Sequence, residues 1–176
     1  LRPGLLVGQQ YNENGVAETD RHGNPLTFTP EVSLVETDPN TLEITGIRVI
    51  KYPPDYNAYN GGNQRNQLQI FRFADVLLMV AEAEMRNGDN ASALVLINQL
   101  RTARGASTVA TMPLVNSSDV YDPNTLLAER GRELWSESWR RQDLIRFGVY
   151  LLPWDLKDND DPKYLLFPIP PDQLIA

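Results

Sequence analysis

The sequence of 176 residues contains no cysteine and only one histidine, His22. Without cysteine, the chain has no disulfide framework, no thiol nucleophile and no cysteine zinc site. One histidine cannot supply a multi-histidine metal site. A histidine base for hydrolysis is poorly supported, because His22 lies in the turn-like stretch RHGNP. We therefore expect no metal and no cofactor, and we expect His22 to be an exposed loop residue.

The chain also lacks a long hydrophobic run and an excess of positive charge. No segment approaches the roughly 18–20 apolar residues that a membrane-spanning helix needs. A total of 16 lysines and arginines against 23 acidic residues gives a formal net charge of −7, which argues against DNA or RNA as a partner. Phosphate-binding glycine loops, the nucleophile elbow and the EF-hand pattern are absent as well.

The composition changes near residue 67. Residues 1–66 are rich in glycine, proline, asparagine and threonine, and they include two short β-prone runs, LTFT and LEITGIRVIKY. We expect a loop-rich segment here, with one or two short strands and a candidate ligand face. From residue 67 to 176 the helical period dominates. We expect the two segments to form one domain together.

Two helices separated by a short turn are predicted between residues 71 and 103. Apolar residues recur in them at three- and four-residue spacings. These are Phe71, Ala74, Leu78, Ala81 and Met85 in the first helix and Ala93, Leu94, Ile97, Leu100 and Ala103 in the second. Gly88 ends the first helix, and Asp89 or Asn90 caps the second. The pair, an antiparallel hairpin, has the size of one tetratricopeptide repeat, although any helical hairpin fits as well.

A third, long amphipathic helix is predicted from Asp122–Pro123 to Gly148, with Asp122 as its N-cap. It contains the charged stretch ERGRELWSESWRRQDLIRFG, residues 129–148. Three glutamates recur there at every fourth position, and arginines lie three or four residues from opposite charges, so ion pairs are expected. The predicted fold class is therefore mainly α, a tetratricopeptide-like hairpin plus a long helix.

An enzymatic alternative for this helix would use two glutamates as acid and base in glycoside cleavage, and it needs a cleft around the substrate. A carboxylate metal bundle would need the pattern Glu-x-x-His, which is absent. Nucleic-acid binding is opposed by the interleaved acidic residues. A helix stabilised by ion pairs is favoured, and we expect no enzymatic activity.

A candidate binding site is the stretch KYPPDYNAYNGGNQRNQ, residues 51–67, in which tyrosines alternate with amide side chains. Aromatic faces stack against the C–H groups of sugars, and amides exchange hydrogen bonds with sugar hydroxyls. We expect Tyr56, Tyr59 and Asn60 to bind carbohydrate, with Trp154 as a weaker candidate. The alternative is a loop whose tyrosines are half-buried anchors.

Three segments in this order and spacing resemble the C-terminal region of the SusD/RagB family of Bacteroidetes outer-membrane lipoproteins. They are residues 71–105, residues 129–148 and the stretch YLLFPIPPDQL at residues 164–174. The family pattern of the long helix is met by Glu129, Arg130, Glu133, Leu134, Glu137, Arg140, Asp143, Leu144 and Arg146. It departs at Ser138, where the family usually has glycine, and at Gly131, which costs about 1 kcal/mol of helix propensity relative to alanine.

The resemblance implies helix pairs of the tetratricopeptide kind with irregular loops as the ligand face. It implies a non-enzymatic protein, exported across the periplasm and lipid-anchored at the surface of the outer membrane. Such a protein binds an oligosaccharide or starch-like polysaccharide and delivers it to a TonB-dependent, SusC-like transporter. This chain is expected to be a C-terminal piece of a longer protein, so the N-terminal lipid anchor, the one membrane contact implied, lies outside it.

Two alternatives stay open at this point. The chain could bind peptides or another non-glycan nutrient, or it could be a helical-repeat scaffold for protein interactions.

Overall fold

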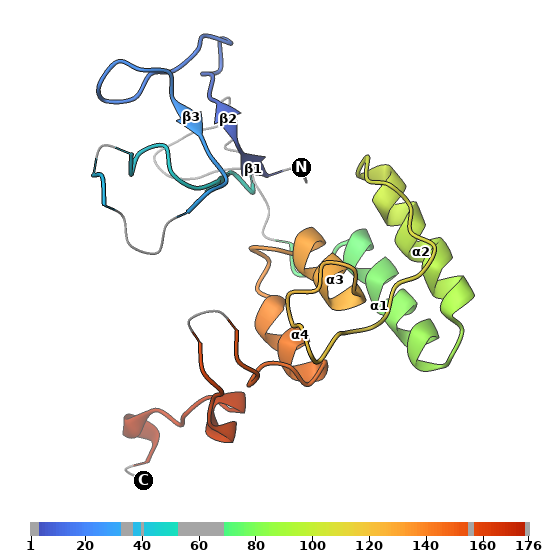
Figure 1. The fold of residues 1–176 in the computed structure, drawn as a ribbon. Coiled ribbons are helices and arrows are strands. Elements are labelled where there is room, and N and C mark those ends of the chain that lie inside the picture. The colour runs from blue at the N-terminus through green and yellow to red at the C-terminus, as the bar shows by residue number, and fades with distance from the viewer. Residues whose placement is uncertain (1–3, 33–36, 40, 53–68, 155–156, 175–176) are drawn as a thin grey trace. The chain divides into compact units, whose positions relative to one another are not determined.

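The computed structural model describes residues 4–32, 37–39, 41–52, 69–154 and 157–174. The chain divides into two compact units, Leu1–Leu68 and Gln69–Ala176 (Figure 1). Among the described residues, no helix has the length and apolar character needed to cross a membrane. That the two parts form one domain stays a prediction.

The first unit consists of loops and short paired strands. Strand β1 (Leu5–Leu6) pairs antiparallel with β4 (Arg48–Val49), and β2 (Gly8–Gln9) pairs antiparallel with β3 (Thr27–Phe28). Strands β3 and β4 lie in the two β-prone runs, which confirms the prediction of short strands there. Their partners β1 and β2 were not predicted, because a strand of two residues is too short to show an alternating pattern.

Backbone and side-chain hydrogen bonds stabilise the turns between β2 and β3. The Asn12 carbonyl accepts the Gly15 N–H at 2.9 Å, and Gly15 has a φ of 75°, which favours glycine. In the next turn the Asp20 carboxylate accepts the N–H groups of His22 and Asn24, each at 2.8 Å. His22 is exposed in this turn, as predicted.

In the second unit, α1 (Phe73–Arg86) and α2 (Asn90–Ala103) form the predicted antiparallel hairpin (Figure 1). Gly88 ends α1 because its φ of 90° departs from the helical conformation. Residues with a side chain rarely adopt such a φ, so glycine suits this position. The Asp89 carboxylate then accepts the Ser92 N–H at 2.9 Å and caps α2. Both predicted signals are therefore confirmed, and the fold is mainly helical as expected.

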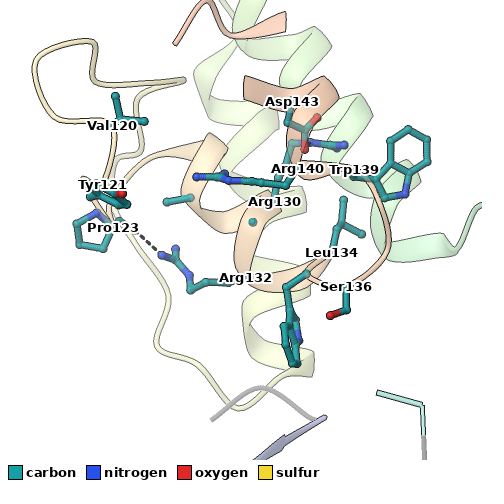
Figure 2. Close-up of a pocket in the computed structure, with 13 residues that line it drawn as sticks. Val120, Tyr121, Pro123, Arg130, Arg132, Leu134, Ser136, Trp139, Arg140 and Asp143 are labelled. Carbon is teal, nitrogen blue, oxygen red and sulfur yellow. Dashed lines mark hydrogen bonds and ion pairs between the residues drawn. The ribbon is translucent and has the colours of Figure 1, made fainter. Parts of the chain in front are cut away.

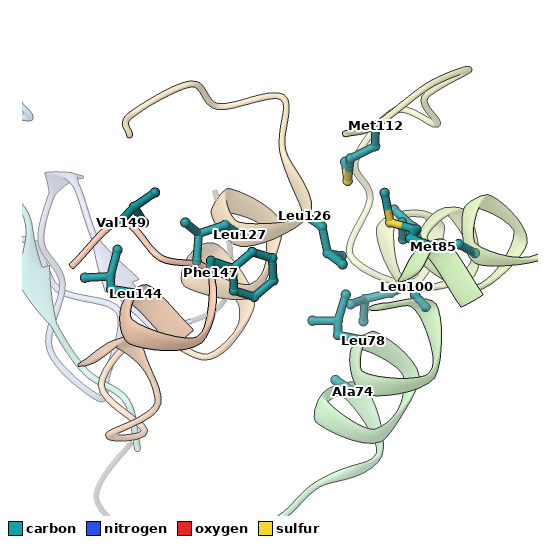
Figure 3. Packing of buried hydrophobic residues seen from close by; sticks show 13 residues of the cluster. Ala74, Leu78, Met85, Leu100, Met112, Leu126, Leu127, Leu144, Phe147 and Val149 are labelled. Carbon is teal, nitrogen blue, oxygen red and sulfur yellow. The ribbon is translucent and has the colours of Figure 1, made fainter. Parts of the chain in front are cut away.

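The hydrophobic core of this unit joins the hairpin to the segments that follow it (Figure 3). Its buried residues are Ala74, Leu78, Ala81, Met85, Ala93, Ile97, Leu100, Met112, Leu126, Leu127, Leu144, Phe147 and Val149. Two residues predicted on the buried faces, Phe71 and Ala103, are exposed because they lie at the ends of the hairpin. Phe71 precedes α1, and its ring centroid lies 5.5 Å from that of Trp139.

The predicted long helix is wrong, because the chain forms two short helices instead. Helix α3 (Leu126–Glu133) and helix α4 (Arg140–Arg146) are separated by a turn in which Ser136 and Ser138 have φ values of 59° and 66°. Positive φ values are incompatible with a continuous α-helix. The turn redirects α4 so that Leu144 is buried in the core. The spacing of residues along the chain does not reveal this burial, because it depends on contacts with other segments.

The predicted N-cap is also wrong, because Thr125 takes this role in place of Asp122. The Thr125 hydroxyl accepts the Ala128 N–H at 3.1 Å. The first two helical N–H groups, of Leu126 and Leu127, donate to carbonyls of the preceding loop at 2.9 and 3.1 Å. These tertiary hydrogen bonds select the start of α3, and local sequence signals do not contain them.

The tail after α4 contains two short 3-10 turns, Pro162–Leu165 and Pro171–Gln173. Its apolar side chains are exposed at Leu166, Phe167, Ile169 and Leu174. Arg141 contacts the tail through its guanidinium, which lies 4.3 Å from the centre of the Phe167 ring and donates to the Tyr164 carbonyl at 2.7 Å.

Candidate functional site

A pocket of about 500 Å³ opens between α3, α4 and the loop that precedes α3 (Figure 2). Its aromatic and cationic lining consists of Tyr121, Trp135, Trp139, Arg130, Arg132 and Arg140. Figure 2 shows Tyr121 and Trp139 on opposite sides of the pocket. Flat apolar faces combined with guanidinium groups suit a ligand that has both a ring and a polar or anionic substituent.

The turn between α3 and α4 places the two pocket tryptophans. Trp135 and Trp139 flank this turn, with Ser136 and Ser138 in left-handed conformations between them. Such a conformation costs a non-glycine residue on the order of 1–3 kcal/mol unless its surroundings impose it. The φ of Ser138 gives a physical reason for the glycine that is usual at this position of the family pattern.

Gly131 makes room for the pocket residue Arg140. A Cβ at position 131 would lie 2.8 Å from the Arg140 Nη1 atom, closer than van der Waals contact allows. The same Nη1 donates a hydrogen bond of 3.0 Å to the Leu127 carbonyl. The glycine that costs helix propensity therefore lets the guanidinium cross the surface of α3 next to the pocket.

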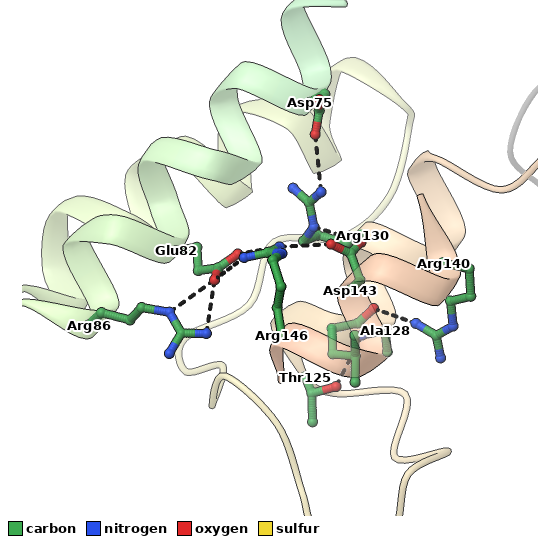
Figure 4. A network of polar contacts seen from close by, with 10 residues as sticks. Asp75, Glu82, Arg86, Thr125, Ala128, Arg130, Arg140, Asp143 and Arg146 are labelled. Carbon is green, nitrogen blue, oxygen red and sulfur yellow. Dashed lines mark hydrogen bonds and ion pairs between the residues drawn. The ribbon is translucent and has the colours of Figure 1, made fainter. Parts of the chain in front are cut away.

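Arg130 lines the pocket and is a buried charge within a network of polar contacts (Figure 4). It is 1% exposed, and its Nε donates to the Asp143 carboxylate at 2.9 Å. Its Nη2 lies 3.1 Å from the carboxylate of Asp75, which is 0% exposed. Asp143 also accepts a hydrogen bond of 2.7 Å from Arg146. Buried charges of this kind persist in a fold only when they are paired.

The glutamates of the charged stretch pair mainly with arginines in α2 or at the ends of α1 and α2. Glu133 binds Arg72 at 2.6 Å and Arg104 at 2.7 Å, and Glu129 binds Arg101 at 2.6 Å. Pairs within one helix occur at Arg132–Glu129 and Arg146–Asp143. Four charged residues of this stretch, Glu129, Arg130, Glu133 and Asp143, are buried, and their ion pairs reach segments that are distant in the sequence as well as neighbours in the same helix.

These ion pairs shift the titration of the buried carboxyls. Burial by itself would raise the pKa of Glu133, but hydrogen bonds from Arg104 and Arg72 outweigh it and hold this pKa below its ordinary value of 4.5. At Glu82, burial likewise raises the pKa, but hydrogen bonds from Arg146 and Arg86 outweigh it, so the pKa of Glu82 is also lowered. Both carboxyls are therefore ionised at neutral pH.

Only one of the sequence-predicted binding residues lies within the described part of the chain. Tyr56, Tyr59 and Asn60 lie outside the described residues, and their role stays a prediction. Trp154 is half-buried, with the Lys157 ammonium 4.3 Å from its ring centre. Its ring centroid lies 6.3 Å from that of Tyr121, which lines the pocket. In the described ranges, no three acidic or histidine side chains gather in a way that could hold a metal ion.

Sequence reasoning missed the pocket residues Tyr121, Trp135, Trp139 and Arg140. A continuous helix would place the two tryptophans about one turn apart, with no turn between them to form a concave site. The available signal was the position of Ser138, because a usual glycine inside an apparent helix indicates a turn. Combined with the neighbouring tryptophans, that signal could have located a concave site.

Comparisons with known proteins agree on one family. The sequence model described as "SusD family" matches residues 8–174. The SusD-like protein P25 of Formosa agariphila is 32% identical over 120 residues, which are 64% of this chain and 23% of P25. The SusD-like protein P38 of the same organism is 38% identical over 87 residues, which are 44% of this chain and 16% of P38. The matched regions thus span less than a quarter of either relative.

Proposed function

Since this chain belongs to the SusD family, we propose that it binds a nutrient glycan, an oligosaccharide or a starch-like polysaccharide, at the cell surface. It delivers the glycan to a TonB-dependent, SusC-like transporter of the outer membrane, where a lipid anchor holds the protein. Binding involves no bond cleavage. The family match over residues 8–174 is the observation that carries this proposal.

The chemistry of the pocket is consistent with glycan binding. Tyr121, Trp135 and Trp139 provide aromatic rings for stacking against sugar C–H groups. Glutamates that could serve as an acid and base pair are instead held by arginines, as Glu133 is by Arg72 and Arg104. A carboxylate held ionised in this way cannot donate the proton that glycoside cleavage needs.

Tyr56, Tyr59, Asn60 and Trp154 form a second proposed set of contacts. They offer aromatic faces and an amide group, so each can meet a sugar without any chemical step. The double variant Tyr56→Ala/Tyr59→Ala is expected to weaken oligosaccharide binding and to leave the helical signal in circular dichroism unchanged. Unchanged affinity in calorimetry would remove these two residues from the site.

The test of the function itself is a glycan array followed by titration calorimetry with the full chain. Binding to at least one glycan, without release of smaller sugars during incubation, agrees with the proposal. Sugar release would show catalysis and contradict it. Failure to bind any glycan on the array would refute glycan recognition by this chain, and a peptide panel then tests the alternative nutrient.

One observation favours the alternative of a helical scaffold. The outer face of α1 exposes apolar side chains at Phe73, Val76, Met79 and Val80. Exposed apolar side chains gathered on one helix face are typical of a protein contact. A transporter that co-purifies through residues 69–148 without any glycan binding would support the scaffold.

A further inference from the structure

Arg140 differs from the other arginines of the second unit. Seven of the nine arginines in the described part of Gln69–Ala176 lie within ion-pair distance of a carboxylate: Arg72, Arg86, Arg101, Arg104, Arg130, Arg132 and Arg146. Arg141 has its guanidinium over the rings of Tyr150 and Phe167. Arg140 has neither kind of partner among the described residues, and it lines the pocket.

Most N–H donors of the Arg140 guanidinium make no hydrogen bond with the described residues. Its one hydrogen bond within the described residues runs from Nη1 to the Leu127 carbonyl. A guanidinium carries five N–H donors in a planar fork that fits the oxygens of a carboxylate or sulfate. An exposed arginine in this state is therefore ready to bind an anionic group that enters the pocket.

The other charged residues that line the pocket are paired with opposite charges. Arg130 is 1% exposed, and its buried Nη1 atom has no hydrogen-bond partner among the described residues. The one acidic residue in the lining, Asp143, is also 1% exposed and is bound by Arg130 and Arg146. Its charge is thus neutralised locally. What an entering ligand meets is a cation between aromatic rings.

The aromatic walls specify a ring-shaped ligand. Trp135 and Trp139 come from the turn between α3 and α4, and Tyr121 comes from the loop before α3. A volume of about 500 Å³ lies within the range of small-molecule sites. Sugar rings stack on such walls through their C–H groups, and an acidic substituent then reaches a neighbouring guanidinium.

We propose that this pocket binds an acidic sugar unit, a uronate or a sulfated sugar, with its ring on the tryptophans and its anionic group on Arg140. The inference rests on the proposed glycan-binding function and names the class of glycan. The formal net charge of −7 disfavours the general attraction of polyanions. Recognition must therefore come from the local geometry of the pocket.

The test uses tryptophan fluorescence in a Trp154→Phe background. The chain has three tryptophans, so this background leaves Trp135 and Trp139, both in the pocket lining. The probes are oligogalacturonate for carboxylates, dextran sulfate for sulfates, and dextran as the uncharged counterpart of dextran sulfate. We expect one of the two anionic probes to change the fluorescence with saturation, and dextran to leave it unchanged.

Two pocket variants and one matched control identify the anion contact. Arg140→Gln is expected to weaken the anionic probe about tenfold or more, the usual effect of losing a charge-assisted hydrogen bond. Gly131→Ala keeps the charge but places a Cβ 2.8 Å from Nη1, so it displaces the guanidinium and is expected to weaken the probe several-fold. Arg21→Gln removes the same charge from the other unit and is expected to leave the affinity unchanged.

The outcomes separate the inference from the proposed function. Anionic probes that bind equally to the parent and to Arg140→Gln would overturn the inference. If only uncharged glycans bind, the inference is overturned too, although the glycan-binding function stands. Failure to bind any charged or uncharged glycan would refute both. Equal loss in Arg140→Gln and Arg21→Gln would show attraction by charge alone and would also overturn it.

Discussion

Replacing Arg130 by methionine tests whether the buried ion pairs hold the second unit together. Arg130 joins Asp75 of α1 to Asp143 of α4, at 3.1 and 2.9 Å. Asp75 is 0% exposed, and its one ion pair within the described residues is with Arg130. Arg130→Met therefore leaves this carboxylate buried without its cation, whereas Asp143 keeps Arg146.

The expected loss of unfolding free energy is about 3–5 kcal/mol, the usual cost of removing one partner of a buried pair. Most of this cost is the penalty of an uncompensated charge and not the worth of the pair itself. The double variant Asp75→Leu/Arg130→Met removes the orphaned carboxylate as well. It should therefore regain on the order of 1–3 kcal/mol relative to Arg130→Met.

Urea unfolding followed by tryptophan fluorescence measures this free energy. All three tryptophans lie in Gln69–Ala176, so the signal reports on the second unit. A loss below about 0.5 kcal/mol in Arg130→Met would refute the reasoning, because that is the range of ordinary surface substitutions. A double variant no more stable than Arg130→Met would show that the Asp75 carboxylate is not the source of the loss.

Two further stability predictions concern the turn and the acid range. Ser138→Gly is expected to raise the unfolding free energy by roughly 1 kcal/mol, because glycine adopts a φ of 66° without strain. A lower urea midpoint would contradict this. The lowered pKa values of Glu82 and Glu133 predict a stability contribution that is complete above their ordinary value of 4.5. It is lost as pH falls through the lower folded-state values. In Glu133→Gln the unfolding free energy should fall less steeply as the pH is lowered. An unchanged dependence of the unfolding free energy on pH, measured by urea unfolding below pH 5, would contradict this.

The hairpin shows what local signals predict well. Gly88 ends α1 and Asp89 caps α2, and both effects act within a few residues of the chain. The buried faces of the two helices follow the predicted spacing except at their ends. Propensity, capping and apolar period all agree in this segment, and such agreement makes a prediction reliable.

The charged stretch shows where local signals fail. Its apolar and charged residues fit one continuous helix, yet the chain turns at Ser136 and Ser138. The turn is stabilised by contacts outside the stretch, such as the pair between Arg72 and Glu137, which are 65 positions apart. A periodicity argument compares residues three or four positions apart, so it cannot weigh such a contact.

The sequence by itself determined the family resemblance, the mainly helical fold, the hairpin and its cap, because each depends on residue types at short spacing. Tertiary structure alone decided the division of the long helix, the pairing of its glutamates with arginines of the α1–α2 hairpin and its ends, and the pocket of Tyr121, Trp135, Trp139 and Arg140. These features depend on which distant segments meet. Which segments meet is decided by burial and charge pairing over the whole second unit, and residue spacing along the chain does not contain this information.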